Sequence, residues 1–232
     1  MTRPSLPSSL LPCPLLLCSL LALLAVPACG PEKKFQPVGP GTIEDRVWRN
    51  GDLGLQLTFP DGWSIQDDAQ KKRLMDAGAE VVSGDDEQLS AEIAAGTKRT
   101  INLFSVFERP VGSTLTFNPS IIGIAENLRL APEVQTPEDY FREAKKLLAR
   151  SPVEVEYPRA PDTQPLGGQE FSVLYASLKP GAETAQQRYF ARRFDDHMVL
   201  VIASHATDEQ KAAIDAALAT LTFVAPEGEQ PK

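Results

Sequence analysis

The sequence predicts an α+β fold, or a layered sandwich, around an antiparallel sheet. Strand-like runs fill much of the C-terminal half, and the short connections at 179–181 and 195–197 join three of them. Short connections of this kind are typical of antiparallel hairpins. Helix-like segments lie among the strands without the regular strand–helix alternation of a doubly wound parallel sheet. The strand-like runs are residues 153–157, 170–178, 187–194 and 198–205.

The first strand of the domain is predicted at residues 53–59. Leucine and phenylalanine alternate there with smaller or polar residues, which gives the strand one apolar face. Residues 60–62, Pro-Asp-Gly, have the composition of a turn. Trp63 and Ile65 then resume the alternation.

Helices are predicted before the next two strands in the sequence. One is expected around residues 69–82, and Leu89 and Ile93 suggest a short second helix within the ambiguous segment 83–96. Strands are expected at 100–108 and 120–128. The buried side of the first helix is expected to comprise Leu74, Met75, Val81 and Val82.

Two helices carry clear start signals. Thr136 is placed to cap a helix whose first turn holds Pro137. Thr207 and Gln210 form a capping box for a final helix, and residues 222–224 can end the domain as a short strand. The helix after Thr136 has an apolar stripe of Tyr140, Phe141, Ala144, Leu147 and Leu148.

The N-terminus resembles a bacterial lipoprotein signal. Arg3 precedes an apolar run at 15–26, and the small residue Ala28 stands directly before Cys29. The resemblance implies that residues 1–28 are removed and that Cys29 carries the lipid. The alternatives are an ordinary secretory peptide with an incidental cysteine, or an uncleaved anchor.

This interpretation implies a chain tethered to a bacterial membrane through lipid on Cys29 and facing the periplasm. Gly30 takes the place of the aspartate that retains some lipoproteins in the inner membrane, which favours the outer membrane. Residues 29–45 are expected to form a flexible spacer, residues 46–224 one domain, and residues 225–232 a disordered tail. The net charge of −8 argues against nucleic acid as a partner.

No constellation for catalysis, metal binding or cofactor binding is predicted. His197 and His205 fall at opposite ends of one expected strand, too far apart to share a metal ion. The segment 195–197 fits a polar turn better than a catalytic pair. The acidic segment 85–87 lacks the spaced ligands of a calcium loop and fits a solvated turn.

Four residues are candidates for a partner or ligand surface. Trp63 fits a core position packed against a helix, with a ligand platform as the alternative. Glu126 ends an apolar strand and is expected to pair with Arg129 or a neighbouring strand, or to serve a site. Arg188 and Arg192 share one face of a strand, as a basic surface for an acidic partner or as solvated strand charges.

Three segments resemble the PsbP-like family, which includes envelope lipoproteins of the DcrB-like kind. They are the opening strand with its Pro-Asp-Gly-Trp turn (50–63), the strand and helix of 121–150, and the closing hairpin, helix and phenylalanine of 189–223. The resemblance implies an αβα sandwich around a central antiparallel sheet. Members of the family mostly act as binding or assembly factors, and a fold alone does not fix an activity.

The leading hypothesis is a non-catalytic, lipid-anchored envelope protein that binds a protein partner as adaptor or assembly factor. The alternative is a carrier of a small molecule or lipid, with a pocket between the sheet and the helices. An enzyme has the least support. A carrier should show a continuous apolar cavity, whereas an adaptor should show a closed core and an exposed apolar patch.

Overall fold

The computed structural model describes residues 35–113, 117–179 and 184–224. Their strands form two sheets, and neighbouring strands are antiparallel in both. The larger, central sheet has the order β4-β5-β6-β11-β10-β9-β7, with β8 also paired to β9. The smaller sheet has the order β1-β2-β3-β12.

The central sheet is built mainly from long strands. Its members are β4 (Ser64–Ile65), β5 (Thr100–Phe107), β6 (Ser120–Asn127), β7 (Val155–Glu156), β8 (Asp162–Leu166), β9 (Gln169–Leu178), β10 (Ala185–Phe194) and β11 (His197–His205). The smaller sheet comprises β1 (Thr42–Glu44), β2 (Val47–Asn50), β3 (Leu55–Thr58) and β12 (Thr222–Phe223).

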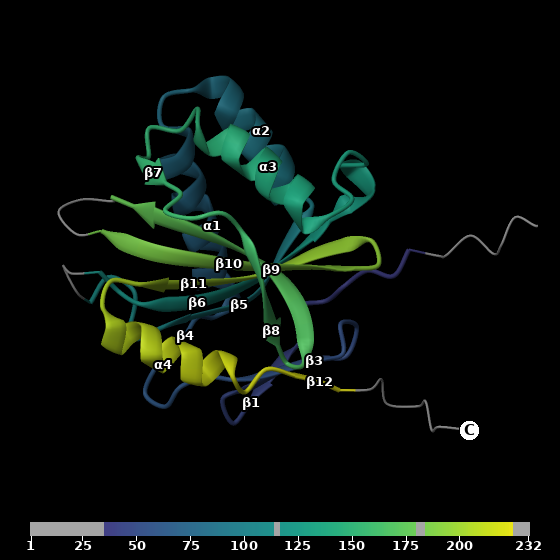
Figure 1. The fold of residues 1–232 in the computed structure, drawn as a ribbon, viewed down its shortest axis with the longest axis vertical. Coiled ribbons are helices and arrows are strands. Elements are labelled where there is room, and N and C mark those ends of the chain that lie inside the picture. The colour runs from purple at the N-terminus through teal and green to yellow at the C-terminus, as the bar shows by residue number, and fades with distance from the viewer. Residues whose placement is uncertain (1–34, 114–116, 180–183, 225–232) are drawn as a thin grey trace, which may run out of the picture. The chain divides into compact units, whose positions relative to one another are not determined.

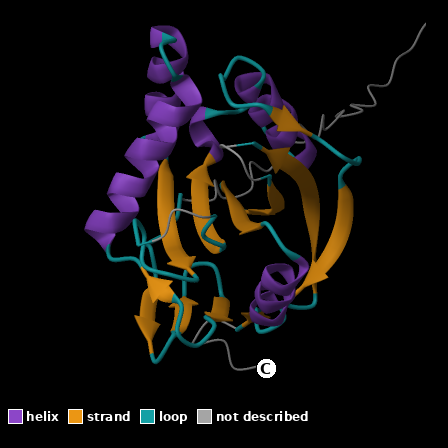
Figure 2. Ribbon diagram, turned by 90° about the vertical axis from the view of Figure 1, so that its left-hand side faces the viewer, coloured by secondary structure: helices purple, strands orange, loops and turns teal. Residues whose placement is uncertain are grey.

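Helices cover both faces of the central sheet. Figure 1 shows α1 (Asp68–Ser83), α2 (Glu87–Thr97) and α3 (Pro137–Leu148) on one side, and α4 (Asp208–Leu218) with the smaller sheet on the other. The side view in Figure 2 shows the same layers. A short 3₁₀ helix, η1 (Leu128–Leu130), follows β6. The predicted α+β class and the αβα sandwich around an antiparallel sheet are therefore confirmed.

Two hydrophobic clusters lie on opposite faces of the central sheet. The larger contains Trp48, Phe104, Phe171 and Ile214 and joins the central sheet to the smaller sheet and α4. The second, around Phe141, packs α3 against the sheet. The face beneath α1, α2 and α3 thus has the smaller share of the core, and the candidate site lies there.

The helix starts follow the sequence signals. The Thr136 hydroxyl accepts from the Asp139 backbone N–H, and Thr207 accepts likewise from Gln210, each within a complete capping box. Asp67 and Asp86 cap α1 and α2, so the acidic segment 85–87 starts a helix. The antiparallel β9–β10 and β10–β11 hairpins are also confirmed.

The expected start of the domain at residue 46 is wrong. Val38 is only 6% exposed, and β1 pairs with β2, so residues assigned to the spacer belong to the folded unit. The Trp48 indole N–H donates to the Pro40 carbonyl at 2.8 Å, and the Asn50 amide donates to Gly39 at 2.8 Å. These bonds order a segment whose proline and glycine content is typical of a flexible coil.

The buried side predicted for the first helix is wrong at one position. Val81 is 62% exposed, whereas Leu74, Met75 and Val82 are half-buried. Val81 lies beside the stripe that these three residues form with Gly78 at about 100° per residue. That stripe lines a pocket between the helices and the central sheet.

Candidate functional site

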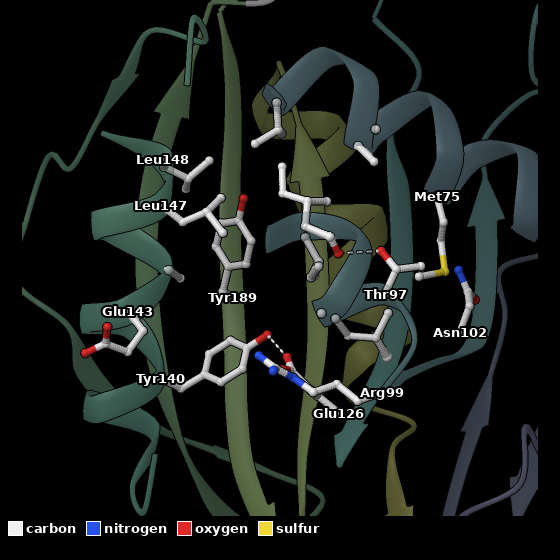
Figure 3. A pocket seen from close by; sticks show the side chains of 18 of the residues that line it. Met75, Thr97, Arg99, Asn102, Glu126, Tyr140, Glu143, Leu147, Leu148 and Tyr189 are labelled. Carbon is white, nitrogen blue, oxygen red and sulfur yellow. Dashed lines mark hydrogen bonds and ion pairs between the residues drawn. The ribbon is translucent and has the colours of Figure 1, made fainter. Parts of the chain in front are cut away.

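A pocket of about 560 Å³ lies between the central sheet and helices α1, α2 and α3. Its size falls in the range of small-molecule sites in proteins. Figure 3 shows the helices as its walls and the strands as its floor.

The three helices contribute mostly apolar or small residues. From α1 come Leu74, Met75, Gly78, Ala79 and Val82, from α2 Ile93 and Gly96, and from α3 Ala144, Leu147 and Leu148. A side chain added at Gly78 or Gly96 would meet nothing within 4 Å of its Cβ. Glycine at these two positions therefore leaves space open along the helix walls.

The floor follows from the alternation of side chains along β6, β11 and β10. Ile122, Ile124 and Glu126 of β6 line the pocket. Ile202 of β11 pairs directly with Ile122, which places their side chains together on the same face. Tyr189 of β10 completes the floor.

One end of the pocket is polar. Arg99 Nε donates to Glu126 Oε1 at 2.5 Å, and the Tyr140 hydroxyl donates to Oε2 at 2.8 Å. Figure 3 shows these three side chains together, while Leu147 and Leu148 lie toward the other end of α3. The Arg99 and Glu126 side chains are 29% and 10% exposed. We call Arg99, Glu126 and Tyr140 the polar triad.

Burial and the neighbouring carboxylate act together on Tyr140. Burial raises the pKa of its hydroxyl well above the usual value, and the charge and hydrogen bond of Glu126 raise it further. Tyr140 therefore stays a hydrogen-bond donor to Glu126 throughout the physiological range.

Several further polar groups of the floor and walls are bonded within the protein. The Asn102 amide donates to the Ser105 hydroxyl at 2.9 Å, and the Thr97 hydroxyl donates to the Ile93 carbonyl at 3.0 Å. The Tyr189 hydroxyl donates to Gln187, and burial raises its pKa. The site is therefore a mostly apolar pocket with the polar triad at one end, and the carboxylates of Glu92, Glu133 and Glu143 also belong to its lining.

The arrangement of the pocket is suited to binding a small, mostly apolar molecule.

Within the described residues, no group of three or more His, Cys, Asp or Glu side chains could hold a metal ion. His197 and His205 lie at the two ends of β11, as the sequence predicts. His197 stacks on Phe35 with ring centroids 5.5 Å apart, and Nδ1 of His205 is buried without a hydrogen-bond partner in the described part of the chain.

Of the four residues singled out from the sequence, Glu126 alone lines this pocket. It pairs with Arg99, which directly precedes β5, the strand beside β6. Arg129 instead approaches Asp196, at 4.0 Å. The pairing with a neighbouring strand, rather than with Arg129, is thus the one the structure contains.

The other three lie in the layer on the opposite face of the sheet. Trp63 is 8% exposed within the larger hydrophobic cluster, which shares no residue with the pocket lining. Arg188 is 8% exposed, and its guanidinium lies 2.5 Å from Asp215 of α4. Arg192 donates to the Glu170 carbonyl at 2.7 Å. Trp63 therefore occupies the core, and both guanidinium groups are engaged within the domain.

Sequence reasoning missed Arg99 as a site residue and placed Tyr140 only in an apolar stripe. The signal for Tyr140 was a hydroxyl within that stripe, opposite a strand that ends in a carboxylate. The sequence offers no comparable signal for Arg99, because its approach to Glu126 depends on the register of β5 and β6, in which Thr100 pairs with Glu126.

The expected lipid attachment at Cys29 lies outside the described residues. In the part of the chain that the structure describes, no helix combines the length and the apolar character needed to cross a membrane.

Comparison with known proteins finds similarity among solved structures. No protein-family model matches the chain, and no curated protein matches it. Among solved structures, the chain is similar to the solution structure of cyanobacterial PsbP (CyanoP) from Synechocystis sp. PCC 6803. The two are 14% identical with a TM-score of 0.46, over 84% of this chain and 99% of that one.

Proposed function

We propose that this protein is a lipid-anchored binding protein of the bacterial envelope that carries a small, mainly apolar molecule. The observation that supports the proposal is the 560 Å³ pocket, with helix walls rich in apolar and small residues and one polar end. Pockets of this kind bury most of a ligand's apolar surface and orient it through a few polar groups.

The pocket favours a carrier over the adaptor that the sequence put first. An adaptor was expected to have a closed core and an exposed apolar patch. The large exposed hydrophobics among the described residues are Val81, Val111, Leu130 and Val224, which belong to four separate segments. A protein partner stays a prediction.

The lipid anchor would fit a carrier that exchanges its ligand near a membrane. An acyl chain and an apolar cargo partition to the same surface, so a tether at Cys29 would hold the pocket where an apolar ligand is most concentrated. This step depends on the lipoprotein signal and is tested separately from the pocket.

Native mass spectrometry of protein purified without detergent tests the proposal. We expect an added mass that organic extraction removes, and saturable binding of the fluorescent apolar probe N-phenyl-1-naphthylamine after that extraction. Extracted, folded protein that neither retains a molecule nor binds the probe would contradict the carrier function. Copurification of a stoichiometric protein, with no small molecule, would return the adaptor to first place.

A further inference from the structure

The pocket has one cationic lining residue, and its charge is already compensated. Arg99 is the single Lys or Arg among the lining residues. Its Nε lies 2.5 Å from Oε1 of Glu126, in a setting where the carboxylate is 10% exposed. An anionic head group entering this end would meet a guanidinium that has a carboxylate beside it, and like charges at short range are costly to bring together.

The remaining carboxylates add to the negative side of the balance. Glu92 pairs with Arg150 at 2.6 Å and Glu143 with Lys146 at 3.0 Å, so both are partly neutralised from outside the lining. Glu133 also lines the pocket, and no cationic group of the described residues lies within 4.0 Å of its carboxylate. The uncompensated charge at the pocket is therefore negative, which again disfavours an anion.

A cationic head group is no better served at the polar end. Both oxygens of Glu126 accept hydrogen bonds already, one from Arg99 and one from Tyr140. A cation there would approach the guanidinium of Arg99, and like charges at short range are costly to bring together.

An uncharged oxygen can accept hydrogen bonds from the N–H groups of Arg99 that the polar triad does not use. The side-chain hydrogen bonds of Arg99 within the described residues use Nε alone, so its two terminal nitrogens keep N–H groups to donate. A carbonyl, ester or hydroxyl oxygen accepts such bonds without adding charge to a partly buried pair. The apolar walls beyond would then hold a hydrocarbon chain.

We infer that the ligand is an uncharged amphiphile, with a hydrocarbon chain and a head group whose oxygen accepts hydrogen bonds from Arg99, and that Glu126 is the residue that excludes anions. This rests on the proposed carrier function, and it assigns that pocket its ligand class.

The test compares three probes that share one chain and differ in head-group charge. Each probe is titrated, below its micelle concentration and at pH 7.5, into the full chain loaded with N-phenyl-1-naphthylamine. The probes are monomyristoylglycerol, myristate and myristyltrimethylammonium, and displacement of the fluorescent compound gives the dissociation constant of each. We expect the dissociation constant of the uncharged ester to be lower than those of both ions by at least about tenfold, given the cost of like-charge contact.

Glu126→Gln identifies the residue responsible. It keeps the shape of the side chain while freeing the charge of Arg99, so we expect the affinity for myristate to rise by about tenfold. Asp76→Asn is the matched control, because it removes one carboxylate from α1 at a site that pairs with Lys72 outside the pocket. Its myristate affinity should stay at the wild-type value.

The outcomes separate the two proposals. Myristate or the ammonium probe binding as tightly as the ester to the wild-type chain would overturn the ligand class while leaving a carrier. If the folded protein binds neither the fluorescent probe nor any of the three compounds, the carrier function itself is overturned. The wild-type comparison decides the ligand class even if Glu126→Gln fails to fold, and a myristate affinity unchanged in folded Glu126→Gln would remove Glu126 as the excluding residue.

Discussion

Arg188 on β10 and Asp215 on α4 form an ion pair of 2.5 Å that fastens the last helix to the central sheet. The Arg188 side chain is 9% exposed, whereas that of Asp215 is 40% exposed and also accepts from Lys211 at 2.6 Å. Burial acts to raise the pKa of Asp215, but the hydrogen bonds from Lys211 and Arg188 outweigh it, and the pKa is lowered. The carboxylate of Asp215 therefore stays ionised beside the buried guanidinium, although it is itself partly exposed.

Removing one partner of this pair should destabilise the domain more than removing both. Asp215→Ala leaves the buried guanidinium without its carboxylate, and we expect a loss of about 1–2 kcal/mol because the site is still partly open to water. Arg188→Met with Asp215→Leu should recover most of that loss. Urea unfolding of the wild type and of these two variants measures it, and a double variant less stable than Asp215→Ala would contradict the account.

The two histidines should make the domain less stable in mild acid. Burial lowers the pKa of both His197 and His205, and the charges of Arg188 and Lys211 lower that of His205 further, against the opposing carboxylates of Asp215 and Asp208. Each histidine has a pKa in the folded chain that lies below the ordinary 6.5. The unfolded chain therefore takes up more protons than the folded chain as the pH falls through 6.5. The free energy of unfolding should therefore decrease from pH 7.5 to 5.5.

Substitution of both histidines by glutamine tests this sign. We expect the pH dependence of stability between 7.5 and 5.5 to become flatter in the double variant, and a single His205→Gln to give an intermediate slope. Urea midpoints at three pH values measure the effect. Stability that rises in mild acid, or a slope unchanged in the double variant, would show that other groups control it.

Gly123 is expected to tolerate no side chain. It lies on β6, and a Cβ there would come within 2.4 Å of the Phe104 ring, which is fixed between Trp48 and Phe59 in the larger cluster. Because a packed aromatic ring cannot withdraw, Gly123→Ala should cost about 1–3 kcal/mol. Gly51→Ala, with nothing within 4 Å, is the control and should change the unfolding midpoint little.

The elements that the sequence predicted are those with a strong local signal. Capping residues at Thr136 and Thr207 and alternation along β9 to β11 depend on neighbours in the chain, so their positions followed from the sequence. The strands that it missed have weak local signals. β8 contains Pro165, which an edge pairing with β9 tolerates, and β1 lies in a segment rich in proline and glycine that pairs only once β2 is in place.

The site was less predictable than the fold. Glu126 was singled out because a carboxylate ended an apolar strand, but its partners come from 27 residues earlier and 14 residues later in the chain. The pocket itself arises from the way three helices stand off one sheet face. No local pattern encodes that separation, and the carrier consequently ranked second to the adaptor.

The lipid anchor has its own test. If Cys29 is the acylated residue, Cys29→Ser should move the protein from the membrane fraction to the soluble envelope fraction or leave it as an uncleaved precursor in the membrane. Metabolic labelling with an alkyne fatty acid, followed by fractionation, distinguishes these results. Labelling that persists in Cys29→Ser would place the lipid elsewhere, and a mature wild-type chain that takes up no label would contradict lipidation.

Filling the pocket should abolish binding without unfolding the domain. Gly78 and Gly96 line it from α1 and α2, and an added side chain at either meets open space. A helix interior also favours leucine over glycine by about 0.5–1 kcal/mol, so Gly78→Leu should be at least as stable as the wild type.

We expect affinity for the fluorescent apolar probe to fall by about tenfold or more in Gly78→Leu/Gly96→Leu, since the new side chains occupy the space the ligand needs. Val81→Leu is the control, because Val81 lies on the same helix with its side chain 62% exposed outside the pocket. A doubly filled, stable variant that binds the probe as tightly as Val81→Leu does would show that the ligand binds somewhere other than between these helices and the sheet.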